Sequence, residues 1–154
     1  MFKFLATAAI AAASVIAPAQ AFTNGGVELV GALEEAGVRI TTTDCTAQGH
    51  AGSYGVYIPS QNHIYICEEN AVTHAQQWET IRHEAVHAAQ ACVDPSMNTV
   101  LMSKQWLKSN ASQSDVQFIV ESYPEEHWAL EVEAFTLMRY SNEEIAWLVN
   151  EACN

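Results

Sequence analysis

The sequence contains few basic residues: six Lys and Arg stand against 18 Asp and Glu, a formal net charge of −12 over 154 residues. So acidic a chain is repelled by a phosphate backbone, which excludes nucleic acid as the expected partner. The hydrophobic fraction of 49% is too high for a disordered acidic protein. At this length we expect one folded domain.

Long apolar runs are missing after the first 21 residues, so we expect no membrane contact from the mature chain. Residues 1–21 combine a positive Lys3, a short apolar stretch and a terminal Ala19-Gln20-Ala21. This combination is typical of a secretory signal peptide. We therefore predict an exported protein, secreted or periplasmic, with a single mature domain at 22–154.

Cys-x-x-Cys spacing is also absent, which argues against a four-thiolate zinc site. The four Cys residues are an even number in a compartment that we expect to be oxidising. Two disulfides are therefore favoured. We predict Cys45–Cys67 between neighbouring β segments and Cys92–Cys153 between two helices.

Glycine and proline do not occur at 73–92, where apolar residues recur at spacings of three and four. This pattern predicts a helix of about five turns, which Asp94-Pro95 ends. Strands are expected where β-branched or alternating residues cluster, at 38–43 and in a hairpin of 53–58 and 63–67. Further helices are expected at 27–35, 98–108, 115–122, 124–139 and 142–152.

The predicted fold class is therefore α+β. A small N-terminal β-sheet or hairpin precedes a helical half, and two disulfides stabilise the domain. The four Trp residues occupy apolar helical positions, so we expect them in the core: Trp78, Trp106, Trp128 and Trp147.

Residues 83–87 read HEAVH, an H-E-x-x-H motif inside the long predicted helix. His83 and His87 lie one turn apart on a helix, so both imidazoles can reach one tetrahedral Zn²⁺. Glu84 can instead take a proton from the metal-bound water. On a helical wheel the histidines lie opposite the apolar stripe, which predicts one face on the core and one lining a cleft. The alternative is a solvated histidine pair on an exposed face.

Two histidines need a third protein ligand in a catalytic zinc site. The G-x-x-H continuation of metzincins does not follow the motif, which excludes that class. Glu131 lies within an apolar arc of a later helix, where an unpaired carboxylate is costly to bury, and a metal ion would be a good partner. We predict Glu131 as the ligand, then Glu133, then His127. The other interpretations are that Glu131 is a rim residue or that it pairs with Arg139.

H-E-x-x-H followed on a later helix by Glu131-Val132-Glu133-Ala134 resembles the zincin metallopeptidases of the gluzincin type. The resemblance implies a zincin-like domain in which His83, His87 and Glu131 hold zinc and Glu84 is the general base. It also implies that the strand before the motif, 63–67, pairs with an extended peptide. Many gluzincins place Asp or Asn four residues after the glutamate to orient a zinc histidine. Here that residue is Phe135, so the orienting partner must come from elsewhere.

The leading hypothesis is an exported zinc-dependent peptidase that hydrolyses peptide bonds in a peptide or protein substrate. An alternative is a secreted zincin-like binding or inhibitory domain that retains zinc without efficient catalysis. A third is a disulfide-stabilised structural protein without metal. The sequence indicates no oligomeric state. Four residues near the second motif carry donors that suit oxyanion stabilisation: Tyr123, His127, Arg139 and Tyr140.

Overall fold

The structure, a computed structural model, describes residues 24–154, so the predicted signal peptide at 1–21 lies outside the described residues. This part of the chain confirms the predicted α+β class. Its helices are α1 (Asn24–Glu35), α2 (His74–Val93), α3 (Lys104–Asn110), α4 (Gln113–Ser122), α5 (Trp128–Leu137) and α6 (Asn142–Cys153). Its strands are β1 (Arg39–Thr43), β2 (Gly55–Ile58) and β3 (His63–Cys67).

The three strands form one sheet in the order β1-β3-β2, with β3 parallel to β1 and antiparallel to β2. The predicted hairpin is confirmed, and its turn is a 3₁₀ turn that ends at Asn62 with a φ of 47°. Because β3 is paired along both edges, the expectation that 63–67 binds an extended peptide is wrong. The edge strand of the hairpin is β2.

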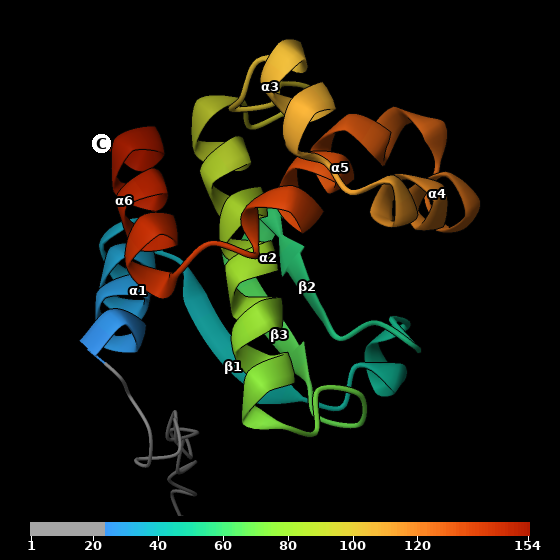
Figure 1. Cartoon of the computed structure of the whole chain (residues 1–154). Coiled ribbons are helices and arrows are strands. Elements are labelled where there is room, and N and C mark those ends of the chain that lie inside the picture. The colour runs from blue at the N-terminus through green and yellow to red at the C-terminus, as the bar shows by residue number, and fades with distance from the viewer. Residues whose placement is uncertain (1–23) are drawn as a thin grey trace, which may run out of the picture.

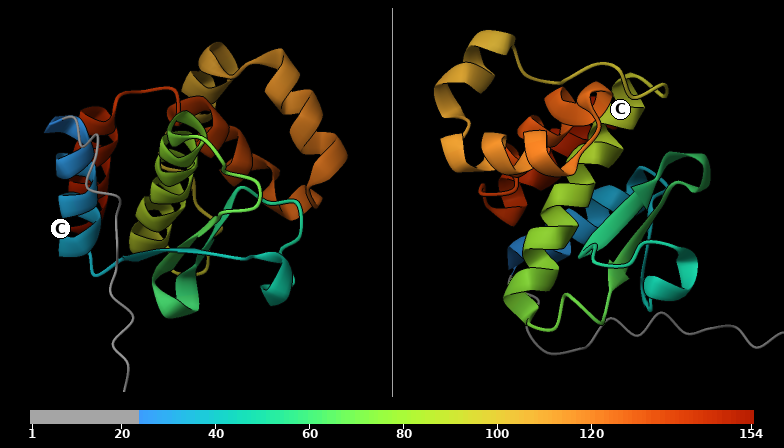
Figure 2. Two further views of the ribbon diagram at one scale, coloured as in Figure 1. Left: turned by 90° about the horizontal axis from the view of Figure 1, so that it is seen from below. Right: turned by 90° about the vertical axis from the view of Figure 1, so that its right-hand side faces the viewer.

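Helix α2 runs across the sheet through the centre of the molecule (Figures 1 and 2). Thr73 caps its first turn, and the Gln76 side chain returns a bond to the Thr73 backbone, which makes a capping box. On one side α2 contacts β2 and β3, and on others it contacts α5 and α6. It is therefore buried on every side over 84–90. The alternative of a solvated histidine pair is wrong, because His87 is buried.

Both predicted disulfides are confirmed. Cys45–Cys67 ties the segment after β1 to the end of β3, and Cys92–Cys153 joins the C-terminal ends of α2 and α6. Helices α1 and α6 lie side by side (Figure 2) and complete the core against α2. Within residues 24–154 no helix is long and apolar enough to cross a membrane. The disulfides are compatible with an extracellular location.

Three expectations about the helical half need correction. Residues 98–103 are a loop rather than the start of a helix, since the Asp94 carboxylate accepts bonds from the Ser96 and Asn98 amides and folds the chain back. The predicted helix at 124–139 is divided into a 3₁₀ turn at Glu125–His127 and α5. Trp147 is also not a core residue: it is 63% exposed on α6.

Candidate metal centre

Three side chains from two helices converge beside the middle of α2. His83 and His87 lie one turn apart, with their Nε2 atoms 3.2 Å from each other. Glu131, in the first turn of α5, places Oε2 3.3 Å from His83 Nε2 and Oε1 3.5 Å from His87 Nε2. These three residues could hold a metal ion.

The spacing of the ligand atoms is short enough for one metal ion, because each residue offers one ligand atom and these atoms all lie within 4.8 Å of one another. Metal bonds of about 2.0–2.1 Å at tetrahedral angles separate two ligand atoms by about 3.3–3.4 Å, close to the 3.2 Å between the two imidazole nitrogens. In addition, Oε2 of Glu131 is buried without a hydrogen-bond partner. A buried carboxylate oxygen without a donor is costly, and a cation would relieve that cost. The residues present therefore fit a metal ion.

In the metal-free site, the carboxylate of Glu131 and the imidazole of His87 each change the pKa of the other. Burial alone would raise the pKa of Glu131, but the neighbouring imidazoles of His83 and His87 outweigh it and hold that pKa well below its usual range. Burial likewise opposes a charge on His87, yet Glu131 and Glu84 raise the pKa of His87 above its ordinary value. An imidazolium and a carboxylate thus pair where a metal ion would bind.

Glu84 is held in place by the edge strand. One of its oxygens, Oε2, accepts a hydrogen bond of 2.8 Å from the backbone N–H of Tyr57 on β2. Gly55 permits this approach, because a Cβ there would lie 2.4 Å from Thr80 Cγ2 on α2. The close contact of β2 with α2 therefore fixes the carboxylate next to the ligand pair.

Gln90, one turn after His87 on α2, orients that histidine. Its amide nitrogen donates to Glu133 at 2.8 Å, so its oxygen faces His87 and accepts from Nδ1 at 2.7 Å. In the neutral imidazole, the form that binds a metal, the proton then stays on Nδ1 and the Nε2 lone pair is free. Gln90 therefore supplies the orienting contact that Phe135 cannot make. Gln90 is not among the residues predicted for the site, and the sequence signal for its role is a Gln among the alanines of a buried helix.

Comparison with known proteins assigns the chain to a family but does not assign an activity to it. A family model described as "Domain of unknown function (DUF8637)" matches residues 20–153. The chain belongs to the DUF8637 family. No curated protein and no solved structure matches the chain. The chemistry of this DUF8637 domain must therefore be argued from its own residues.

The other ligand candidates lie apart from the histidines. Glu133 is fully buried, and it accepts bonds from the backbone N–H groups of Leu101 and Met102 as well as from Gln90. His127 is exposed in the 3₁₀ turn before α5. The structure thus brings Glu131, and neither alternative, to the histidine pair.

The four candidates for oxyanion stabilisation in the DUF8637 domain lie in different surroundings. Burial raises the pKa of the Tyr123 phenol, and the charges of Glu131 and Glu84 raise it further, so Tyr123 remains a donor near both carboxylates. Arg139 forms an ion pair with Asp115 and not with Glu131. Tyr140 lines a separate hollow of about 400 Å³ between α3, the end of α5 and α6.

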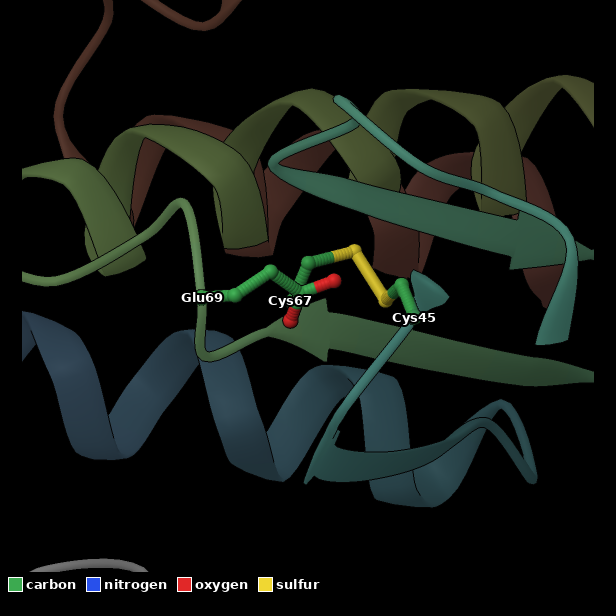
Figure 3. A group of neighbouring side chains, drawn as sticks. All are labelled: Cys45, Cys67 and Glu69. Atoms are coloured by element: carbon green, nitrogen blue, oxygen red, sulfur yellow. A yellow bond between two sulfur atoms is a disulfide. The ribbon is translucent and has the colours of Figure 1, made fainter. Parts of the chain in front are cut away.

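A second cluster of potential ligands, Cys45, Cys67 and Glu69, does not form a metal site. Figure 3 shows the two sulfur atoms joined in a disulfide, which leaves no thiolate to bind a cation. The Glu69 carboxylate accepts bonds from the Thr46 backbone and hydroxyl and so fastens the 3₁₀ turn after β1. This end of the sheet is structural.

Proposed function

We propose that this protein is an exported zinc-dependent peptidase with a zincin-like domain. The observation that carries the proposal is the convergence of His83, His87 and Glu131, with each imidazole nitrogen 3.3–3.5 Å from a Glu131 oxygen and Glu84 next to His83 on the same helix. Two imidazoles and one carboxylate are a ligand set of catalytic zinc sites, which leave a fourth position open. The disulfides support export to an oxidising compartment.

Peptide hydrolysis needs a base that later serves as an acid. A bound zinc ion would polarise the carbonyl and lower the pKa of water. Glu84 would take a proton from the attacking water while the water oxygen forms its bond to the carbonyl carbon. The same carboxyl would then return the proton to the nitrogen as the C–N bond breaks. The products are a carboxylic acid and an amine, and Glu84 is regenerated.

Two further features support a peptide substrate. Burial and the charges of Glu131 and Glu84 raise the pKa of Tyr123 and so keep its phenolic proton, which suits a donor to the developing oxyanion. The β2 strand lies at the edge of the sheet nearest the base, because its Tyr57 amide bonds to Glu84. An extended peptide can add to such an edge through its own backbone.

A second candidate is a secreted domain that binds zinc without efficient turnover. The observation favouring it is burial: Glu131 is only 8% exposed and the Glu84 carboxylate already accepts a backbone bond. In such a domain Glu84 would be a structural residue with no part in any reaction.

Metal analysis of the purified exported protein, combined with Glu84→Gln, tests both candidates. A zinc site should retain about one ion per chain after dialysis, and both candidates fail if reconstituted protein keeps none. Glu84→Gln should leave zinc bound and lower peptide cleavage by about 10²–10⁴-fold. Wild-type protein that holds zinc but cleaves no peptide in a mixed library would support the binding domain instead.

A further inference from the structure

We propose that Phe118, Tyr123 and Phe135 form a specificity surface for a large apolar side chain of the substrate. We call these three residues the aromatic wall. The proposal rests on the proposed peptidase function and adds the substrate class: peptides with an aromatic or large aliphatic residue beside the scissile bond.

The aromatic wall begins at a metal-ligand candidate. The Phe135 ring, one turn after Glu131 on α5, lies edge-on to His83 with ring centroids 4.8 Å apart. Phe118 on α4 lies 5.8 Å from Phe135, and Tyr123 lies 6.2 Å from Phe118. The rings therefore form a continuous apolar path from His83 outward to α4.

The outer end of this path is open to solvent. Phe118 is 50% exposed, although two other aromatic rings contact it. A contiguous apolar surface that is left exposed is more often a binding site than an isolated exposed residue is. At the inner end Phe135 lies against His83, and the Tyr123 ring lies 6.4 Å from the Phe135 ring. The wall thus runs alongside the groups that would act on the carbonyl.

The chemistry of the aromatic wall favours an apolar rather than a cationic occupant. Asp115, one turn before Phe118 on α4, is already paired with Arg139 and offers no free charge to a basic side chain. The charges of Glu131 and Glu84 would be offset by a bound metal ion. The remaining surface consists of aromatic rings, and burying an apolar side chain of the substrate against them makes the binding free energy more favourable.

Zinc-binding hydroxamates measure this surface without any need for catalysis. We would compare N-acetyl alanine, phenylalanine and lysine hydroxamates, which share one zinc-binding group and differ in the side chain. On zinc-loaded wild-type protein the phenylalanine compound should bind about tenfold more tightly than the alanine compound. Phe118→Ala should bring this ratio near one while the affinity for the alanine compound stays unchanged.

The matched control is Trp147→Ala, which removes another exposed aromatic residue, on α6. It should keep the wild-type ratio. The proposal is overturned if Phe118→Ala keeps that ratio too, or if the lysine compound binds most tightly. A zinc-loaded protein that shows the ratio but cleaves no peptide would refute the peptidase function and leave the aromatic wall supported. Cleavage without preference for apolar residues would refute the wall alone.

Discussion

Glu131 and Glu133 are separated by one residue on α5, and both carboxylates are buried, yet their surroundings are opposite. Glu133 accepts three hydrogen bonds, from Gln90 on α2 and from the Leu101 and Met102 backbone amides in the loop at 94–103. Glu131 faces α2, where it meets two imidazoles and keeps one oxygen without a hydrogen-bond partner. Burial alone therefore does not identify a ligand. A carboxylate whose oxygens are satisfied by N–H donors is structural, and one left unsatisfied beside histidines can bind metal.

The strongest test of this comparison is Glu131→Gln. It should lower zinc affinity by more than about 100-fold, because it removes one of the three ligands that we propose, while loss of an outer-sphere partner costs only about 10–100-fold. Competition with a chromophoric zinc chelator measures the change. An unchanged affinity would mean that Glu131 is not a ligand.

The converse variant, Glu133→Gln, should act on stability. It replaces a charged acceptor with an amide that can accept on one side only, so we expect a loss of about 2–3 kcal/mol in the free energy of unfolding. Urea denaturation of the metal-free protein measures it. Glu126→Gln, in the exposed 3₁₀ turn, is the control and should change stability little. If Glu133→Gln weakens zinc binding more than Glu131→Gln does, the two roles are reversed.

Gln90→Leu should affect both glutamate environments, because Gln90 bonds to His87 in the candidate metal centre and to Glu133. The substitution removes the bond to His87 Nδ1 and one donor to Glu133. We expect zinc affinity to fall by about 10–100-fold and the visible spectrum of the cobalt-substituted protein to change, because the imidazole loses its orientation. A spectrum and an affinity equal to those of the wild type would show that another contact orients His87.

Sequence reasoning predicted what depends on neighbours along the chain. The H-E-x-x-H spacing placed two imidazoles one turn apart, and the structure does the same, since helix geometry is local. Predictions from the sequence were wrong where contacts between segments far apart in the chain determine the structure. On a helical wheel Glu133 lies away from the apolar arc that contains Glu131, but α5 contacts α2 as well as α3 and α4, so Glu133 is buried too.

Long-range contacts explain the remaining errors. Residues 98–103 carry a helical pattern, yet the Leu101 and Met102 amides bond to Glu133, more than 30 residues later. The β3 strand was expected to pair with a peptide, but strand order depends on which segments meet in space, and β1 and β2 occupy both its edges. Helix propensity and hairpin spacing contain no information about either contact.

The smallest expected effect is a difference in pH dependence between the two glutamate variants. Because Glu131 raises the pKa of His87, the metal-free protein keeps a proton there into the neutral range, and zinc must displace it. Zinc affinity should rise about tenfold, or about 1.4 kcal/mol, per pH unit from pH 6.5 until His87 has lost its proton. Conversely, the stability that this proton gives the metal-free fold is present below pH 6.5 and lost as the pH rises through the raised pKa.

Glu131→Gln removes the charge that holds the proton, so its affinity profile should flatten above pH 6.5, whereas Glu133→Gln should keep the wild-type slope. Titration of zinc affinity between pH 6 and 9 in the three proteins measures both. Equal slopes in all three would mean that Glu131 does not control the protonation of His87. A flat profile in Glu133→Gln alone would mean that the buried network through Gln90 sets this pKa instead.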